Sequence, residues 1–176
     1  MTTSRAGRTV ILIAVALLTG AVPAPAQTPT PLVPVGEPIT QAGLRVALGY
    51  LPTAVSLDSG GRLPDGALAL HLQLDVDAAR GNPYGLDSDD SVPYLRLPFT
   101  LTQDGTGRRL DGTLEPMVSR DGFHYGANVV VAGPGTYSLA VEIRPPEGLA
   151  RHTDARTGVL PWWAPFTLTW SFRYPP

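Results

Sequence analysis

The 176-residue chain contains no cysteine, and all 13 of its basic residues are arginine. Without cysteine it forms no disulfide, carries no lipid-modified cysteine after an export signal, and has no thiolate ligand of the kind that blue-copper sites require. The arginines form no basic run, and the formal net charge is −2. A weakly acidic chain of this kind is not expected to bind nucleic acid or an anionic membrane surface.

Long hydrophobic runs are also lacking, except near the start of the chain. There, two arginines precede an apolar run over residues 10–18, and the small residues Ala24-Pro25-Ala26 follow it. This layout predicts a secretory signal cleaved after Ala26, and the run is too short to be a comfortable membrane span. Cleavage would remove two arginines and no acidic residue, which changes the formal charge from −2 to −4. The proline-rich residues 27–38 predict an extended leader, and residues 39–176 a single domain with its own core.

Helical spacing of apolar residues is absent after the signal, whereas alternation of apolar and polar residues is frequent. The alternating stretches are 68–77, 94–101, 137–143 and 166–174. Four Asp-Gly pairs, interpreted as hairpin turns, lie at 65–66, 104–105, 111–112 and 121–122. Together with 19 glycines and 19 prolines, this pattern predicts an all-β fold, an immunoglobulin-like antiparallel β-sandwich.

Histidine and methionine are scarce, with three and two copies, and one of each flanks the same turn. Met117 precedes Asp121-Gly122, and His124 follows it. Facing side chains of an antiparallel pair lie about 4.5–5.5 Å apart at Cβ, close enough to share one ion. The turn can therefore bring two metal ligands together. The alternative is that Met117 fills a gap in the core, as methionine often does.

Each of the other two histidines is ambiguous when taken alone. His71 lies on the polar face of a predicted strand, and Gln73, Asp75 and Asp77 follow on the same face. Oxygen donors beside an imidazole can bind a cation, although a single surface histidine commonly has no function. His152 lies on a predicted loop. There Asp154 could orient the imidazole as a hydrogen-bond acceptor, or could be an ordinary solvated carboxylate.

Six segments of the chain, read together, resemble the periplasmic iron-transport protein family. They are "VGEP" at 35–38, "LHLQLDVDAARGNPYG" at 70–85, "VPYLRL" at 92–97, "GTLEPMVSRDGFHYGAN" at 112–128, "GLARHTDARTGV" at 148–159 and "FTLTWSFRY" at 166–174. The resemblance implies an immunoglobulin-like sandwich and a small periplasmic homodimer that binds Cu²⁺ and iron. It also implies a metal site at His71, Met117, His124 and His152, an inner-membrane iron permease as partner, and no enzymatic activity.

The chain departs from the family pattern at two positions. Where the family commonly has glutamate two residues after the first histidine, this chain has Gln73. Where the family commonly has Met-Pro-Met, this chain has Glu115-Pro116-Met117. Because Glu115 and Met117 share strand parity, we expect both to point the same way. Glu115 could then restore the carboxylate, a ligand type that iron prefers, that is missing at position 73.

Three functions are compatible with these residues. The first is a metal-binding component of iron uptake that hands iron to a permease, with copper at or near the same site. The second is a copper-sequestering protein with no role in iron. The third is a sandwich that binds a partner protein or glycan, with Trp162 and Trp163 as a contact platform and the histidines incidental. Function depends on the site and not on the fold.

Overall fold

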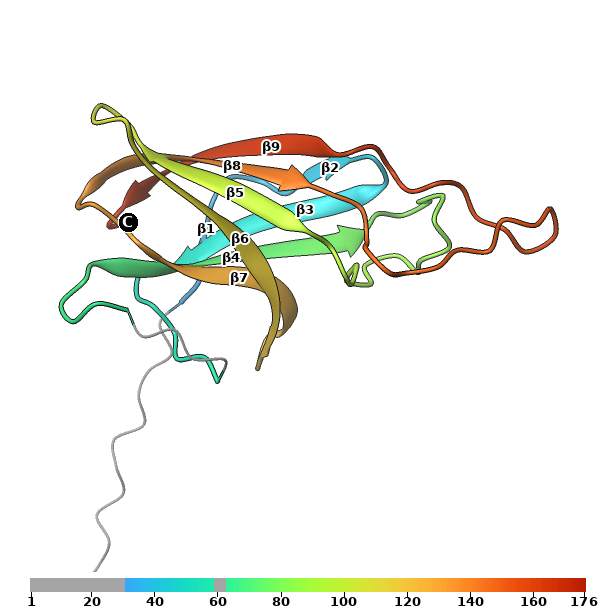
Figure 1. The fold of residues 1–176 in the computed structure, drawn as a ribbon, viewed down its shortest axis with the longest axis horizontal. Coiled ribbons are helices and arrows are strands. Elements are labelled where there is room, and N and C mark those ends of the chain that lie inside the picture. The colour runs from blue at the N-terminus through green and yellow to red at the C-terminus, as the bar shows by residue number, and fades with distance from the viewer. Residues whose placement is uncertain (1–30, 59–62) are drawn as a thin grey trace, which may run out of the picture.

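The computed structural model describes residues 31–58 and 63–176, and within these ranges it contains strands but no helix (Figure 1). The strands are β1 (Val33–Pro34), β2 (Ile39–Gln41), β3 (Leu44–Leu51), β4 (Ala69–Ala78), β5 (Leu97–Gln103), β6 (Arg108–Ser119), β7 (Gly122–Val130), β8 (Gly135–Ile143) and β9 (Phe166–Tyr174). Every strand pair is antiparallel. The predicted all-β antiparallel class is confirmed. The predicted signal, residues 1–26, lies outside the described residues.

One sheet curls over on itself to make the two layers of the sandwich. Its strand order is β1-β3-β4-β7-β6-β5-β8-β9, with β2 beside β3. Strand β6 belongs to both layers: residues 108–114 pair with β5, and residues 115–119 pair with β7. Figure 1 shows β6 running diagonally from the layer of β5, β8 and β9 to that of β3, β4 and β7. The layers also contact each other through the Tyr50 hydroxyl, which donates to the Arg173 carbonyl at 2.8 Å.

The predicted alternation explains which face of each strand is buried. In β8 and β9 every second residue from Tyr137 and from Leu168 onward is buried, and the residues between them are more exposed. β5 follows the same rule, and β4 follows it from Leu72 onward. Burial of an apolar face contributes about 25 cal/mol for each Å² removed from water. The pattern therefore fixes the register, since a slip of one residue would turn every apolar side chain outward.

The Asp-Gly pairs are not all turns. The pair at 104–105 connects β5 to β6, and a two-residue turn at Arg120-Asp121 connects β6 to β7. The pair at 111–112 was predicted as a turn, and this prediction is wrong: it lies inside β6, with Gly112 opposite Phe99. A Cβ at Gly112 would lie 2.7 Å from the Phe99 ring. Glycine is present there to make room for an aromatic ring.

Part of the predicted leader belongs to the sheet. Val33 and Pro34 pair with Tyr50 and Gly49 of β3, and Val35 is buried in the core. No helix in the described ranges is both long and apolar enough to cross a membrane.

Candidate metal centre

The β6–β7 hairpin places Met117 directly opposite His124. The register pairs these two residues, so their side chains point to the same face of the sheet. Gly122, with φ of +116°, ends the two-residue turn in a backbone conformation that residues with a Cβ rarely adopt. The turn therefore brings the Met117 thioether and the His124 imidazole together, as their positions on either side of the turn predict.

Strand β4 contributes to the same face from the other side of β7. His71 pairs with Asn128, and Gln73 pairs with Gly126. Gly126 also pairs with Glu115 of β6. Gln73, Gly126 and Glu115 thus form one row across three strands, and the middle position of the row has no side chain.

The sequence predicts a solvent-exposed polar surface on this face, but the two histidines on it are buried. His71 and His124 are 2% and 4% exposed. The segment that follows β3 covers them: Val55 and Ser56 line a cavity of about 250 Å³ together with both histidines. Other residues of this lining are Gln73, Met117, Val118, Ser119 and Asp121.

The two imidazoles are close enough to bind one ion. Their ring centroids lie 6.0 Å apart with the planes at 85°. A metal–nitrogen bond of about 2.0–2.1 Å puts each ring centre about 3 Å from the ion, so two ligating rings have centres about 5–6 Å apart. The observed spacing therefore suits a shared divalent cation.

Both rings have a hydrogen-bond acceptor beside Nδ1. His71 Nδ1 lies 3.0 Å from Asn128 Oδ1, and His124 Nδ1 lies 3.4 Å from the Gly122 carbonyl oxygen. An Nδ1–H that donates to such an oxygen leaves the lone pair on Nε2 for a metal. Burial lowers the pKa of His71; the Asn128 hydrogen bond opposes this shift, and the nearby His124 adds to it. The lowered pKa favours the neutral ring, which is the form that binds metals.

Gly126 provides the space that the His71 ring occupies. A Cβ at this position would lie 2.8 Å from His71 Nε2 and 2.9 Å from its Cε1. The imidazole therefore leans across β7 toward β6, where Glu115 is the next residue of the row. Glu115 and Met117 line an adjoining cavity of about 840 Å³ that also includes Asp58. The glutamate is thus placed beside the site, although it does not line the cavity of the two histidines.

Asp121 lines the histidine cavity, and sequence reasoning missed it as a site residue. It was interpreted only as a turn residue. The available signal was its position between Met117 and His124, because a turn that joins two ligand-bearing strands also carries its own side chains to that end of the hairpin.

His152 lies elsewhere in the chain. It is exposed and belongs to the connection between β8 and β9, which extends beyond the end of the sheet, away from the β6–β7 hairpin (Figure 1). Its Nδ1 lies 3.0 Å from Thr157 Oγ1, and that hydroxyl donates to Asp154 Oδ2 at 2.6 Å. Asp154 therefore orients His152 through Thr157 and not directly, and the same bond lowers the pKa of Asp154.

A single chain thus brings together two of the three histidines. Among the described residues, no group of three or more His, Cys, Asp or Glu side chains is close enough to hold a metal ion. The expectation that all three imidazoles meet around one ion is not met within one copy of the chain.

Both tryptophans have partners within the fold. Trp163 is buried and donates from Nε1 to the Ile143 carbonyl at 3.2 Å. Trp162 packs on Tyr84 and lies under the Arg151 guanidinium. Both rings join the β8–β9 connection to the one between β4 and β5, so their role in the fold accounts for them.

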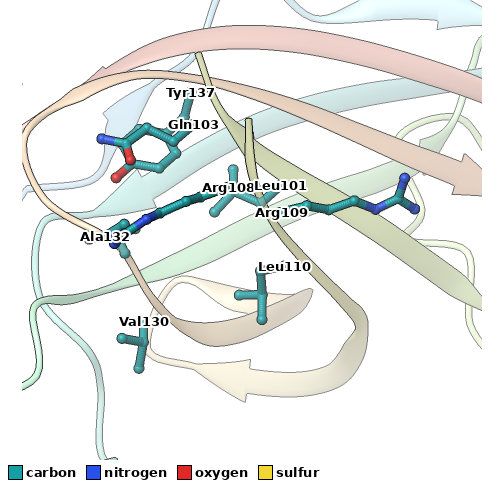
Figure 2. Close-up of a pocket in the computed structure, with 9 residues that line it drawn as sticks. Leu101, Gln103, Arg108, Arg109, Leu110, Val130, Ala132 and Tyr137 are labelled. Atoms are coloured by element: carbon teal, nitrogen blue, oxygen red, sulfur yellow. The ribbon is translucent and has the colours of Figure 1, made fainter. Parts of the chain in front are cut away.

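A further cavity, of about 600 Å³, lies between β6 and the end of β7. Figure 2 shows Arg108 extending toward Ala132, below Gln103 and Tyr137, with Leu110 and Val130 on the lower side. Its lining contains no imidazole, carboxylate or thioether.

Comparison with known proteins identifies the family of the chain. The model of the Fe²⁺ transport protein family matches residues 32–175, which is nearly all of the described chain. The chain belongs to this family.

Curated relatives and solved structures support the assignment. A UPF0423 protein of Brucella abortus is 37% identical over 147 residues, covering 81% of each chain. The 34 kDa membrane antigen of Treponema pallidum is 33% identical over 144 residues, covering 78% of this chain and 71% of its own.

Two solved structures that are similar to this chain contain copper. A copper-bound glutamate-to-glutamine variant of FetP from uropathogenic Escherichia coli is 40% identical, with a TM-score of 0.76, over 82% of this chain and 98% of its own. The copper-reconstituted P19 protein of Campylobacter jejuni is 36% identical, with a TM-score of 0.76, over 82% of this chain and 97% of its own.

Proposed function

We propose that this Fe²⁺ transport family member is a periplasmic metal-binding protein of iron uptake. It binds Cu²⁺ at His71, His124 and Met117, and it passes iron to an inner-membrane permease. The observation that carries the proposal is the cavity in which two buried imidazoles lie 6.0 Å apart beside a thioether. The predicted export signal and the expression of FetP in the periplasm support the location. We infer a role in binding and transfer without catalysis.

The donor atoms suit both metals. Imidazole nitrogen is a good ligand for Cu²⁺, which binds such sites more tightly than the other common divalent ions, and a thioether adds a soft ligand that also tolerates Cu(I). Asp121, which lines the cavity, and Glu115 beside it supply the hard oxygen that iron prefers. A shared or adjoining iron site is therefore chemically reasonable.

Glu115 is proposed to replace the carboxylate that the family commonly has at position 73. Gln73 and Glu115 stand on opposite sides of Gly126 in one row, and facing Cβ positions lie about 4.5–5.5 Å apart. Since His71 Nε2 is 2.8 Å from the place of a Gly126 Cβ, the Glu115 side chain is long enough to approach that nitrogen. Glu115→Gln should weaken iron binding, whereas Gln73→Glu should strengthen it. Unchanged iron affinity in Glu115→Gln would contradict this role.

His152 is proposed to complete the site of a second copy in a homodimer. Within the described ranges no three His, Cys, Asp or Glu side chains lie close enough to hold a metal ion, and His152 is exposed on an extending connection with its Nδ1 beside Thr157 Oγ1. In a two-fold dimer the two copies make the same contacts, so if His152 of one copy reaches the cavity of the other, the reverse contact also forms. Each copy would then supply His71, Met117 and His124 at one site and His152 at the other.

Titration of chelator-treated protein with Cu²⁺ and Fe²⁺ tests the proposed site, with the three imidazole signals followed by NMR. We expect His71→Ala and His124→Ala to abolish tight Cu²⁺ binding. Asn82→Leu, which changes a residue in the β4–β5 connection, is the control and should bind as the wild type does. Full copper affinity in both histidine variants would refute the site.

Copper sequestration without a role in iron is the second candidate, supported by the copper-bound relatives. Growth of a deletion strain on limiting iron, with copper supplied independently, separates the two. Iron uptake predicts a growth defect at every copper level that added iron relieves. Sequestration predicts a defect only at high copper.

A further inference from the structure

Asn128 makes three hydrogen bonds that link His71 to the segment covering the cavity. Its Oδ1 accepts the Val55 N–H at 3.0 Å, and its Nδ2 donates to the Val55 carbonyl at 2.7 Å. The same Oδ1 lies 3.0 Å from His71 Nδ1. An amide oxygen has two lone pairs, so Oδ1 can accept from both the Val55 N–H and His71.

The two bonds to Val55 decide which end of the amide faces the imidazole. If the amide were reversed, its NH₂ group would point at the Val55 N–H and its oxygen at the Val55 carbonyl, and both bonds would be lost. The oxygen must therefore face His71. An oxygen that only accepts requires the hydrogen to be on Nδ1, which leaves the lone pair of the neutral ring on Nε2.

We propose that Asn128 is a positioning residue that holds His71 as the Nδ1–H tautomer, with Nε2 presented to the cavity for a metal. The Val55 backbone fixes the orientation of the Asn128 amide, and the amide fixes the tautomer of His71. Gly126 leaves space beside His71 Nε2. Partners behind a ligating histidine commonly act in this way, and their loss typically costs about 10- to 100-fold in metal affinity. The consequence for metal binding rests on the proposed function; the tautomer does not.

The first experiment needs no metal. Long-range ¹H–¹⁵N NMR of chelator-treated protein, at a pH where His71 is neutral, reports which ring nitrogen carries the hydrogen. We expect Nδ1–H for His71 in the wild type and a shift toward Nε2–H in Asn128→Leu. An Nε2–H tautomer in the wild type would overturn the proposal, whatever the protein binds.

The second experiment separates positioning from a merely structural role. Asn128→Asp keeps an acceptor toward His71 but, like Asn128→Leu, removes the donor to the Val55 carbonyl. If Asn128 positions the ring, Asn128→Asp retains the Nδ1–H tautomer and near wild-type Cu²⁺ affinity, whereas Asn128→Leu binds about 10- to 100-fold more weakly. If Asn128 only anchors the segment that follows β3 (residues 52–58), both variants lose affinity alike, and the proposal fails.

Asn82→Leu is the matched control. In the β4–β5 connection, the Asn82 amide also binds backbone: it donates to the Ala79 and Leu86 carbonyls at 3.1 and 2.8 Å. Its loss should lower stability without changing the His71 tautomer or Cu²⁺ affinity. Should the wild type prove to be Nδ1–H yet bind no Cu²⁺, the proposed function would fail while the tautomer assignment stands.

Discussion

Gly126 and Gly49 flank Gln73 in one row of the sheet, but they tolerate a side chain differently. A Cβ at Gly126 would meet His71 Nε2 and the Leu72 carbonyl oxygen, both at 2.8 Å. The three atoms nearest to a Cβ at Gly49 all belong to the flexible Leu32 side chain, the nearest at 2.8 Å. The backbone oxygen cannot move aside readily, whereas Leu32 can.

Gly126→Ala should therefore displace the His71 ring, weaken Cu²⁺ binding at least tenfold, and lower the free energy of unfolding by about 1–3 kcal/mol, the usual cost of overpacking. Gly49→Ala is the control and should keep its Cu²⁺ affinity. Titration and urea unfolding measure the two effects. Equal affinity in both variants would show that the space over Gly126 is not needed.

The buried His71 also makes stability depend on pH. Burial lowers its pKa in the folded protein, whereas an unfolded histidine has a pKa of about 6.5. Just below that value the unfolded chain takes up a proton that the folded chain does not. The folded state therefore loses stability as pH falls from about 6.5 toward the lowered pKa, and His71 adds no pH dependence above this window.

Urea unfolding of metal-free protein at a series of pH values should show this loss, and His71→Gln should reduce its slope. The same slope in His71→Gln and the wild type would mean that other groups cause it.

At the scale of elements, the β6–β7 hairpin assembles the site, and its turn is the sensitive point. Gly122 has φ of +116°, and Gly66, before β4 and outside the cavity lining, has φ of +74° with no atom within 4 Å of an added Cβ. Alanine at either position should cost about 1–3 kcal/mol of backbone strain. Only Gly122→Ala should also weaken Cu²⁺ binding, because Met117 and His124 depend on that turn for their pairing. Thermal unfolding and titration of both variants test this; equal copper affinities would contradict it.

The β8–β9 connection has its own small network around His152. Thr157→Val keeps the shape of the side chain but removes the hydroxyl that joins His152 to Asp154. We expect stability to change by less than about 0.5 kcal/mol, since the group is exposed, while Cu²⁺ affinity falls because the ring is no longer held. Unchanged affinity would argue that His152 is not a ligand.

At the scale of the whole molecule, the question is whether two copies share each site. His71→Ala and His152→Ala chains, carrying different tags, can be co-expressed and the hybrid dimer purified. A shared site predicts one intact copper site in the hybrid and none in either parent, since the unchanged cavity of one chain meets the unchanged His152 of the other. If no hybrid forms, or if the hybrid binds no copper, the shared site is refuted.

The class of fold and the buried faces of the strands follow from local sequence patterns. Alternation in β4, β5, β8 and β9 was sufficient, because period-two burial is a local property that needs no knowledge of neighbours. The sequence also indicated that Met117 and His124 meet, since a two-residue turn fixes the register of its own hairpin. The same local rule failed at Asp111-Gly112, where a Phe99 ring from the adjacent strand determines that the second residue is glycine.

The surroundings of those residues depend on tertiary packing. The segment that follows β3 (residues 52–58) covers His71 on a face that alternation alone assigns to solvent. Asn128 and Gly126 join the site through pairing with β4. His152 is placed outside the cavity by a long connection whose path no local pattern specifies. Turns and alternation depend on residues a few positions apart in the sequence. The cavity, its hydrogen bonds and the placement of the third imidazole outside it depend on contacts between strands and loops that are distant in the sequence.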